Sequence, residues 1–180
     1  TLARRLAATL GGAAVVLDPE RGIHRVALRQ PVAGYHHIDV ARLRADSVTG
    51  DLALRDFSIN AIALDLESGR LIDPLGGQAD LRAGVIRLAG AEAIRDDPLR
   101  ALRAVRFAAE LGFAVAPATA AIVARDSHLL ARVAGERQRD ELLRVLDTPV
   151  AAPMLRLADD LGVLDAVVPE LIPAKGCIQP

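Results

Sequence analysis

The periodicity of the hydrophobic residues changes near Gly84, and this change constrains the fold more than any other feature. Before Gly84, residues 24–28 and 35–41 alternate between apolar and polar positions, as strands do. From Asp97 onward, apolar residues recur with the helical period. The helical segments are residues 98–111, 117–126, 135–146 and 153–161. The sequence therefore predicts an α+β fold: a front with a mixed sheet and helices, a boundary within residues 84–96, and an all-helical back.

The front half contains further recognisable segments. Residues 2–10 have a helical pattern, and residues 14–17 form an apolar run of strand length. Residues 57–66 are largely apolar on both faces, which is typical of a buried strand. The turn sequence Glu67-Ser68-Gly69-Arg70 follows that run, and another apolar pair comes next. We therefore expect a hairpin around this turn.

Charge and cysteine content narrow the classes of protein. The formal net charge is −1, so charge alone predicts no nucleic-acid partner. Cys177 is the only cysteine, which excludes an intrachain disulfide. No apolar run is long enough to span a bilayer, and we expect that residues 1–6 are not a signal peptide, because no long apolar segment follows the arginines. The chain has no initiator Met and both ends look cut, so we expect a cytoplasmic fragment, without a membrane partner and with no protein partner inferred.

The basic residues are almost all arginine, because Lys175 is the only lysine. Codon bias in a GC-rich genome would produce this composition. Alternatively, several arginines grip phosphate or base edges, for which the planar guanidinium group suits better than an ammonium group. The two explanations are compatible.

Polar residues interrupt the predicted buried strand at its start. Arg55 and Asp56 precede Phe57, and Asn60 lies inside the run. Buried polar groups are costly unless they are hydrogen-bonded. Two interpretations remain open: an ion pair that ties a helix end to the sheet, or a site that holds a polar ligand such as a ribose.

The stretch from Asp97 to Phe107 is the most informative in the sequence. On a helix with about 100° per residue, Asp97, Arg100 and Arg103 lie on one side. Apolar residues cover the other side: Leu99, Leu102, Val105 and Ala109. Arg106 falls within this apolar arc, so it must be paired or extend towards solvent. The polar side is either an exposed row of salt bridges or a set of acceptors and donors for the edge of a base.

Two other charged or glycine-rich stretches allow two interpretations each. Asp73, Gly76 and Gly77 lie in a loop that is either a plain connection or a mobile hinge beside a nucleotide. Glu136 and Arg137 open a charged helix, which is either a solvated face or a support for the helix that follows Asp97.

Asp39 is the remaining acidic residue of interest. It follows His36 and His37 on a predicted strand, where alternate residues point to opposite faces. This alternation argues against a zinc site. Asp39 is a candidate for one carboxylate of a Mg²⁺ site if other carboxylates lie upstream.

Four of these segments match known motifs in order and spacing. Residues 55–61 are similar to an Arg-Arg-Asp-Phe-Thr-Ile-Asn-Ala signature, and residues 72–87 to the block that follows it. Residues 96–107 are similar to a Glu-Asp-x-x-Arg motif, and residues 136–142 to the next motif. Together they resemble the class II type of CCA-adding tRNA nucleotidyltransferases and bacterial poly(A) polymerases. The resemblance covers nearly the whole chain.

The resemblance implies a role for each matching residue. Asp97 and Arg100 would pair with the base of the incoming CTP or ATP, and Arg55 and Asp56 would contact its sugar. The other nucleotide-binding candidates are Asn60, Arg103 and Arg106. Asp73, Gly76 and Gly77 would lie in a flexible segment, with Glu136 and Arg137 in support. Asp39 would be a catalytic carboxylate that binds Mg²⁺, and the partners would be CTP, ATP and the 3′ end of tRNA.

The resemblance also implies domains and an activity. Residues 1–85 would be the later part of the catalytic head, 86–146 the helical neck and 147–180 the start of the tRNA-binding body. Leu54 stands where the family has its first Arg, and Asp96 where it has Glu. The family's Gly-Gly-x-x-x-Arg-Asp segment and metal-binding Asp-x-Asp are missing from the sequence. We therefore expect an enzyme whose isolated 180-residue piece is inactive.

Three alternatives remain open at this point. The first is a poly(A) polymerase of the same family, because the motifs do not separate the two activities. The second is a noncatalytic RNA-binding module that has lost the metal site. The third is an unrelated helical α/β domain in which the motifs occur by chance, and four ordered motifs argue against it.

Overall fold

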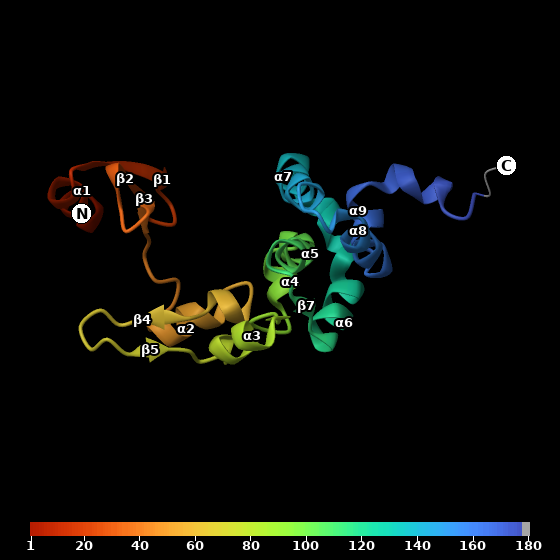
Figure 1. Cartoon of the computed structure of the whole chain (residues 1–180), viewed down its shortest axis with the longest axis horizontal. Helices are drawn as coiled ribbons and strands as arrows, with labels where there is room; N and C mark the ends of the chain where they lie inside the picture. Colours follow the sequence, from red (N-terminus) through yellow and green to blue (C-terminus); the bar gives the residue numbers. More distant parts are fainter. Residues whose placement is uncertain (178–180) are drawn as a thin grey trace. The chain divides into compact units, whose positions relative to one another are not determined.

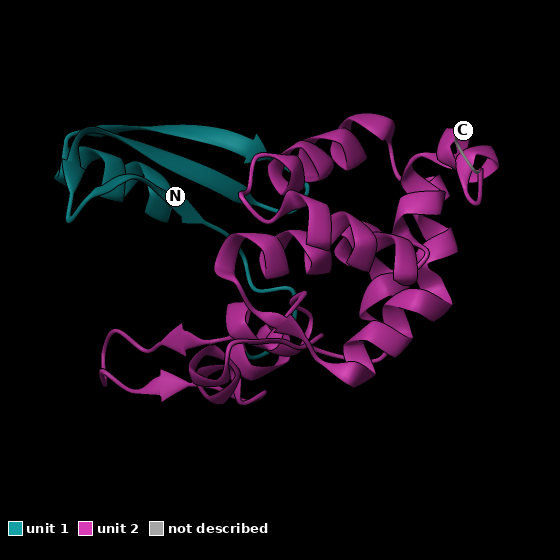
Figure 2. Ribbon diagram, turned by 45° about the vertical axis from the view of Figure 1, so that its right-hand side comes forward, with its two compact units in different colours: residues 1–47 teal, residues 48–180 magenta. Residues whose placement is uncertain are grey.

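The computed structural model describes residues 1–177, which divide into two compact units (Figure 2). The first unit comprises residues 1–47, and the second begins at Val48. The predicted division at residues 85 and 146 is a division by function and stays a prediction. Helices and strands are both abundant, so the predicted α+β class is confirmed (Figure 1).

The first unit is a helix on a three-stranded sheet. The helix α1 (Leu2–Leu10) precedes β1 (Gly12–Asp18), β2 (Ile23–Val32) and β3 (Tyr35–Val40). The sheet has the order β1-β2-β3 and is antiparallel throughout. Its small core joins one face of α1 to the middle of the sheet. The fully buried members are Ala3, Ala7 and Val26. The predicted helix over residues 2–10 and the strands near residues 14–17, 24–28 and 35–41 are confirmed.

The second unit begins with short elements. These are α2 (Val48–Ala53), the 3₁₀ turn η1 (Ser58–Asn60), β4 (Ala63–Leu64), β5 (Leu71–Ile72), α3 (Gly77–Ala83) and β6 (Val85–Ile86). The strands β4 and β5 pair around the expected turn, which confirms the hairpin. The helices α2 and α3 were not predicted.

The predicted buried strand over residues 57–66 is wrong except at β4. The N–H of Asn60 donates to the carbonyl of Phe57, and that of Ala61 to the carbonyl of Ser58, at 3.0 Å each. These i to i+3 bonds wind the chain into a 3₁₀ turn. Phe57 and Ser58 are both fully buried, so the two residues do not alternate between core and solvent as strand residues would.

Helices form the rest of the second unit. They are α4 (Ala93–Asp96), α5 (Leu99–Leu111), α6 (Pro117–Asp126), η2 (Ser127–Arg132), α7 (Gly135–Leu146), α8 (Ala151–Asp160), α9 (Val163–Val167) and η3 (Pro169–Ala174). The helix α5 packs against α7 and α8 at the centre of the main core (Figure 1). The short strand β7 (Ala114–Val115) pairs with β6 in parallel. The predicted bounds of α6 and α7 are confirmed.

Asp97 departs from the predicted helix. Its φ of −147° and ψ of 100° are extended, and α5 begins only at Leu99. The Asp97 carboxylate accepts a hydrogen bond from the N–H of Leu99 at 3.3 Å, which favours an extended residue in front of a helix. Within residues 1–177, no helix is long and apolar enough to cross a membrane.

Candidate functional site

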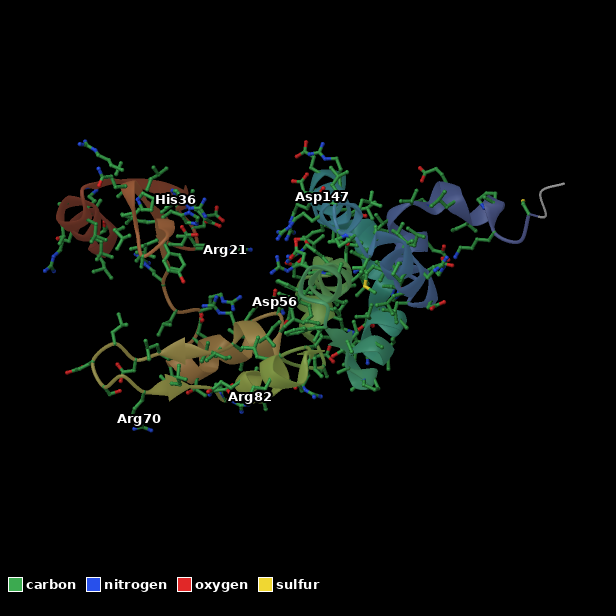
Figure 3. All side chains as sticks on the ribbon, viewed as in Figure 1. Arg21, His36, Asp56, Arg70, Arg82 and Asp147 are labelled. Carbon is green, nitrogen blue, oxygen red and sulfur yellow. The ribbon has the colours of Figure 1, made fainter. Side chains whose placement is uncertain are left out.

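Asp56 lies beside α5 and two residues before the start of η1, and its side chain is only 12% exposed (Figure 3). The Oδ1 atom accepts hydrogen bonds from the N–H of Phe57 at 2.9 Å and from the side-chain amide of Asn60 at 3.1 Å. The Oδ2 atom accepts from Nε and Nη2 of Arg103 at 3.0 and 2.5 Å. Asp56 therefore ties the start of η1 to α5.

The ionisation of Asp56 depends on these contacts. Burial raises the pKa of the Asp56 carboxyl, but the Asn60 hydrogen bond and the charge of Arg103 outweigh burial. The pKa consequently lies below its ordinary value, so Asp56 is a carboxylate at neutral pH. Each of its two oxygens already accepts two hydrogen bonds from protein donors.

Arg103 is the first member of a chain of ion pairs between α5 and α7. Its Nη1 lies 3.4 Å from Oε1 of Glu141, whose Oε2 accepts a hydrogen bond from Nε of Arg106. Arg106 also binds Glu110 at 2.6 Å, and Glu110 binds Arg144 at 2.8 Å. The sequence left two possibilities for Arg106, and the structure shows pairing, because its side chain is 3% exposed and has two carboxylate partners.

An aromatic ring reinforces this network. The guanidinium carbons of Arg103 and Arg106 lie 5.3 and 3.8 Å from the ring centroid of Phe107. Such cation–π contacts stabilise an arginine by about 0.5–2 kcal/mol. The Phe107 ring in turn meets Phe57 edge to face at 5.4 Å. The ion pairs and the aromatic contacts together fix the polar side of α5.

Asp97 is braced from α7. Its Oδ2 accepts a hydrogen bond from Nη2 of Arg137 at 3.1 Å, and its side chain is 35% exposed. Arg137 therefore contacts Asp97 instead of making the Arg137–Glu141 pair of a solvated helix face. The sequence left both interpretations open, and the geometry favours the supporting one.

Arg100 is almost buried, with 8% exposure. Its Nη1 donates to the carbonyl of Ala93 at 3.2 Å, and its Nη2 donates to the carbonyl of Leu54 at 2.9 Å. A guanidinium group has five N–H donors, so these two bonds orient it without using all its donors. Arg100 accordingly keeps N–H groups that could donate hydrogen bonds to a ligand.

Arg55 and Asp56 are adjacent but bind different partners. Arg55 donates from Nε and Nη2 to Oδ2 of Asp51 at 3.1 and 2.7 Å, whereas Asp56 binds Arg103 and Asn60. The Arg55 side chain is 46% exposed, so its other face is open to solvent. The structure therefore places Arg55 at the rim of the network and Asp56 inside it.

The predicted flexible segment is tied down by Asp73. Its Oδ1 accepts from the N–H of Gly77 at 2.7 Å, and its Oδ2 from the N–H of Gln78 at 2.9 Å, both at the start of α3. The hydrogen bond from Gln78 is the main reason that the pKa of the Asp73 carboxyl is lowered. Gly76 has a φ of +70°, which favours glycine.

Asp39 stands in the first unit, on β3. Both of its carboxylate oxygens accept hydrogen bonds from Arg25 on β2, at 2.7 and 2.8 Å. The Arg25 hydrogen bond lowers the pKa of the Asp39 carboxyl. Within residues 1–177, no three His, Cys, Asp or Glu side chains gather as a possible metal site. A Mg²⁺ ion takes several oxygen ligands, so Asp39 with its arginine partner does not by itself fit such a site.

Several residues of the network were not predicted from the sequence. Glu141 holds two arginines, and Ser58, Asp80 and Arg87 form a second cluster under η1. One signal could have pointed to Glu141: an arginine in an apolar arc needs a carboxylate on a neighbouring helix.

Comparison with known proteins agrees with this fold. Residues 14–87 match the model of the poly(A) polymerase head domain, and residues 112–175 match that of the probable RNA- and SrmB-binding site of polymerase A. The CC-adding tRNA nucleotidyltransferase of Geobacter sulfurreducens is 48% identical over 166 residues, which are 92% of this chain and 38% of that protein. The A-adding tRNA nucleotidyltransferase of Deinococcus radiodurans is 43% identical over 98% of this chain and 40% of its own length.

Solved structures give the same result. The Thermotoga maritima CCA-adding enzyme in complex with tRNA has a TM-score of 0.82 at 31% identity, covering 99% of this chain and 42% of the other. The Bacillus stearothermophilus CCA-adding enzyme in complex with CTP has a TM-score of 0.77 at 35% identity, covering 91% and 42%.

The matches place the chain in the class of RNA nucleotidyltransferases. More narrowly, the chain belongs to the family of CCA-adding enzymes and poly(A) polymerases, as the sequence motifs predicted. It spans about 40% of the length of these relatives.

Proposed function

We propose that this chain is the nucleotide-selecting part of a tRNA nucleotidyltransferase. The protein adds CMP and AMP to the 3′ end of tRNA from CTP and ATP. The relatives that carry this proposal are CC-adding and A-adding tRNA nucleotidyltransferases and enzymes solved with CTP or tRNA. In this proposal residues 1–85 are part of the head, residues 86–146 the neck, and residues 147–180 the start of the body. Such an enzyme works in the cytoplasm.

The geometry around Asp97 and Arg100 is the observation that carries the proposal. Asp97 offers acceptors and is held by Arg137, while Arg100 offers donors and is oriented by two backbone carbonyls. Cytosine and adenine each present an amino group beside a ring-nitrogen acceptor on the pairing edge. Uracil and guanine present a carbonyl beside a ring N–H. One fixed acceptor–donor pair therefore accepts CTP and ATP and rejects UTP and GTP.

The sugar contact is proposed for Asp56 and Arg55. Asp56 is ionised, so a ribose hydroxyl would share this acceptor with Phe57, Asn60 and Arg103. Asn60 and Arg103 hold the Asp56 carboxylate in place, and Arg106 anchors the helix that carries Arg103. Preorganised acceptors of this kind lose little conformational freedom when the ligand binds.

Phosphoryl chemistry is proposed to depend on Mg²⁺, with Asp39 as one carboxylate of the site. When bound, such ions activate the attacking hydroxyl and stabilise the leaving pyrophosphate. The family generally depends on a metal, and Asp39 alone does not complete a site. We therefore expect the 180-residue chain to bind nucleotides without adding them. Addition by this chain above the level of Asp39→Ala would contradict that expectation.

Equilibrium binding of the four nucleoside triphosphates to the chain tests the base contacts. Wild type is expected to prefer CTP and ATP over UTP and GTP. The variants Asp97→Ala and Arg100→Ala should lose that preference while keeping the circular dichroism spectrum of the wild type. An unchanged preference in both folded variants would exclude the base-pairing role.

A poly(A) polymerase is the second candidate, because the head-domain match carries that description. The discriminating measurement is product length on a tRNA that lacks its CCA end, made by a protein of the relatives' length that contains this chain. Addition that stops at the CCA end indicates CCA synthesis, and a long A tail indicates poly(A) synthesis. RNA binding without addition by that protein would favour the noncatalytic module.

A further inference from the structure

A closed ring of hydrogen bonds lies beneath the turn η1. The hydroxyl of Ser58 donates to Oδ2 of Asp80 at 2.6 Å, and Arg87 donates to the same carboxylate from Nε at 2.9 Å and from Nη2 at 3.0 Å. The carbonyl of Arg87 accepts the N–H of Ser58 at 2.9 Å, which completes the ring. Residues of η1, of α3 and of the segment after β6 thus meet at one seryl residue.

The main chain on both sides of Ser58 is fixed by the same neighbours. The N–H of Ala89 donates to the carbonyl of Asp56 at 3.0 Å, and Phe57 forms an isolated antiparallel bridge with Leu88. On the other side, Gly77 lies so close that a Cβ atom there would meet the carbonyl oxygen of Ser58 at 2.1 Å. The turn therefore sits between the first turn of α3 and residues 87–89.

The ring is charged, and its serine and carboxylate are buried, whereas the Arg87 side chain is 49% exposed. Ser58 is fully buried and Asp80 is 7% exposed. The Arg87 hydrogen bond is the main cause that lowers the pKa of the Asp80 carboxyl, with a further contribution from Ser58. A buried carboxylate that loses a donor keeps its desolvation cost, so this ring resists movement.

The ring holds the turn that separates Asp56 from Asn60, and it therefore affects how these two side chains are oriented. Asp56 lies two residues before the first residue of the turn, and Asn60 ends it. A 3₁₀ turn of three residues has few internal hydrogen bonds and does not hold its own geometry. The side chains of Asp56 and Asn60 can meet only while the ring of Ser58, Asp80 and Arg87 fixes the turn. None of the bonds of Asp80 and Arg87 goes to Asp56 or Asn60, so these residues act through Ser58.

We infer that Ser58, Asp80 and Arg87 are positioning residues for the nucleotide sugar. They fix the turn so that Asp56 faces Asn60 and Arg103 and presents its carboxylate to the ribose. Because α3 also starts at the Asp73 loop, the same ring couples the sugar contact to that loop. This inference rests on the proposed function, since the sugar contact of Asp56 is part of it.

Three variants test the ring in the 180-residue chain. Ser58→Ala removes the hydroxyl, Ser58→Thr restores it, and Asp80→Asn removes the charge while keeping the shape. Ser68→Ala is the matched control, because the Ser68 hydroxyl also donates to a carboxylate, that of Asp65, in the exposed β4–β5 turn. The measurements are the pKa of the Asp56 carboxyl by NMR titration and the equilibrium affinity for CTP.

We expect the pKa of Asp56 to rise towards its ordinary value in Ser58→Ala and Asp80→Asn, because Asn60 and Arg103 lose their alignment with the carboxylate. The dissociation constant for CTP should rise roughly tenfold, in line with the loss of a hydrogen bond to a charged group. Ser58→Thr should retain most of the wild-type behaviour, and Ser68→Ala all of it. A merely structural effect would lower stability without moving the Asp56 pKa.

The two measurements, the Asp56 pKa and the CTP affinity, separate this inference from the proposed function. If the Asp56 pKa and the CTP affinity are unchanged in folded Ser58→Ala and Asp80→Asn, the inference is overturned and the proposed function stands. If wild type does not bind CTP while the Asp56 pKa still rises in both variants, nucleotide binding by this chain fails and the positioning of Asp56 is supported on its own.

Discussion

Arg103 donates from both Nε and Nη2 to the same oxygen of Asp56, at 3.0 and 2.5 Å, across 47 residues of sequence. This contact joins the turn η1 to the central helix α5. It also leaves the second oxygen of Asp56 to Phe57 and Asn60. The carboxylate is consequently fixed in direction and kept ionised.

The first prediction concerns pH and Asp56. Its pKa is lower in the folded chain than in the unfolded chain, so the unfolded chain takes up the proton first as the pH falls. The stabilisation from Asp56 is therefore fully present above its unfolded pKa of about 3.9 and is lost as the pH falls through the folded value. Urea unfolding should show this loss below about pH 4. In Asp56→Asn the loss should be smaller; an identical pH dependence would contradict the assignment.

The second prediction concerns Glu141, which holds Arg103 and Arg106. Glu141→Gln leaves the 3%-exposed Arg106 side chain with only Glu110 as a charged partner. Loss of one member of a buried pair costs roughly 3–5 kcal/mol, and the remaining partner should bring the loss to about 2–3 kcal/mol. Urea unfolding at neutral pH measures it. The control is Asp140→Asn, whose exposed pair with Arg139 should change stability by less than about 0.5 kcal/mol. Equal losses of unfolding free energy in the two variants would show that the buried network stabilises the fold no more than an exposed ion pair does.

The third prediction concerns the close approach of α3 to η1. In Gly77→Ala the new Cβ would meet backbone atoms of Ser58, at 2.1 Å from its oxygen, so α3 must move away. We expect a loss of about 1–3 kcal/mol, as for an overpacked core. Gly135→Ala is the matched control, since nothing lies within 4 Å of a Cβ there and α7 begins at that residue. Thermal unfolding compares the two; a Gly77→Ala variant as stable as Gly135→Ala would contradict the packing described.

Long periodic segments were predictable from the sequence, and contacts across the chain were not. The bounds of α6 and α7 follow from local pattern and a proline at the first helical position of α6. Apart from β4, the segment of residues 57–66 was wrongly predicted as a strand, because Ser58 donates hydrogen bonds to the Arg87 carbonyl and the Asp80 carboxylate, and these bonds select a turn. Hydrogen-bond partners that are brought together by tertiary packing produce no periodic pattern in the sequence.

In the candidate site, too, the motif was predictable from the sequence and the tertiary contacts were not. The motif around Asp97 and Arg100 could be recognised from order and spacing alone. The sequence could not show that Arg100 is held by carbonyls of Ala93 and Leu54, since backbone acceptors have no residue signature. The charged start of α7 was likewise ambiguous until Arg137 was found on Asp97 rather than on Glu141.

The last prediction follows from that contact. Arg137 and Asp97 are 55% and 35% exposed, so their pair adds little to stability but fixes the direction of the Asp97 carboxylate. Arg137→Ala should therefore leave the unfolding midpoint nearly unchanged and reduce the preference for CTP over UTP several-fold, because a mobile carboxylate aligns less well with the cytosine amino group. Arg139→Ala removes another exposed arginine from the same helix, which pairs with its neighbour Asp140, and should keep the wild-type preference. Competition binding of CTP and UTP to the two variants decides the matter. A loss of preference in both would point to a general effect of charge on α7, and a loss in neither would mean that Asp97 needs no brace.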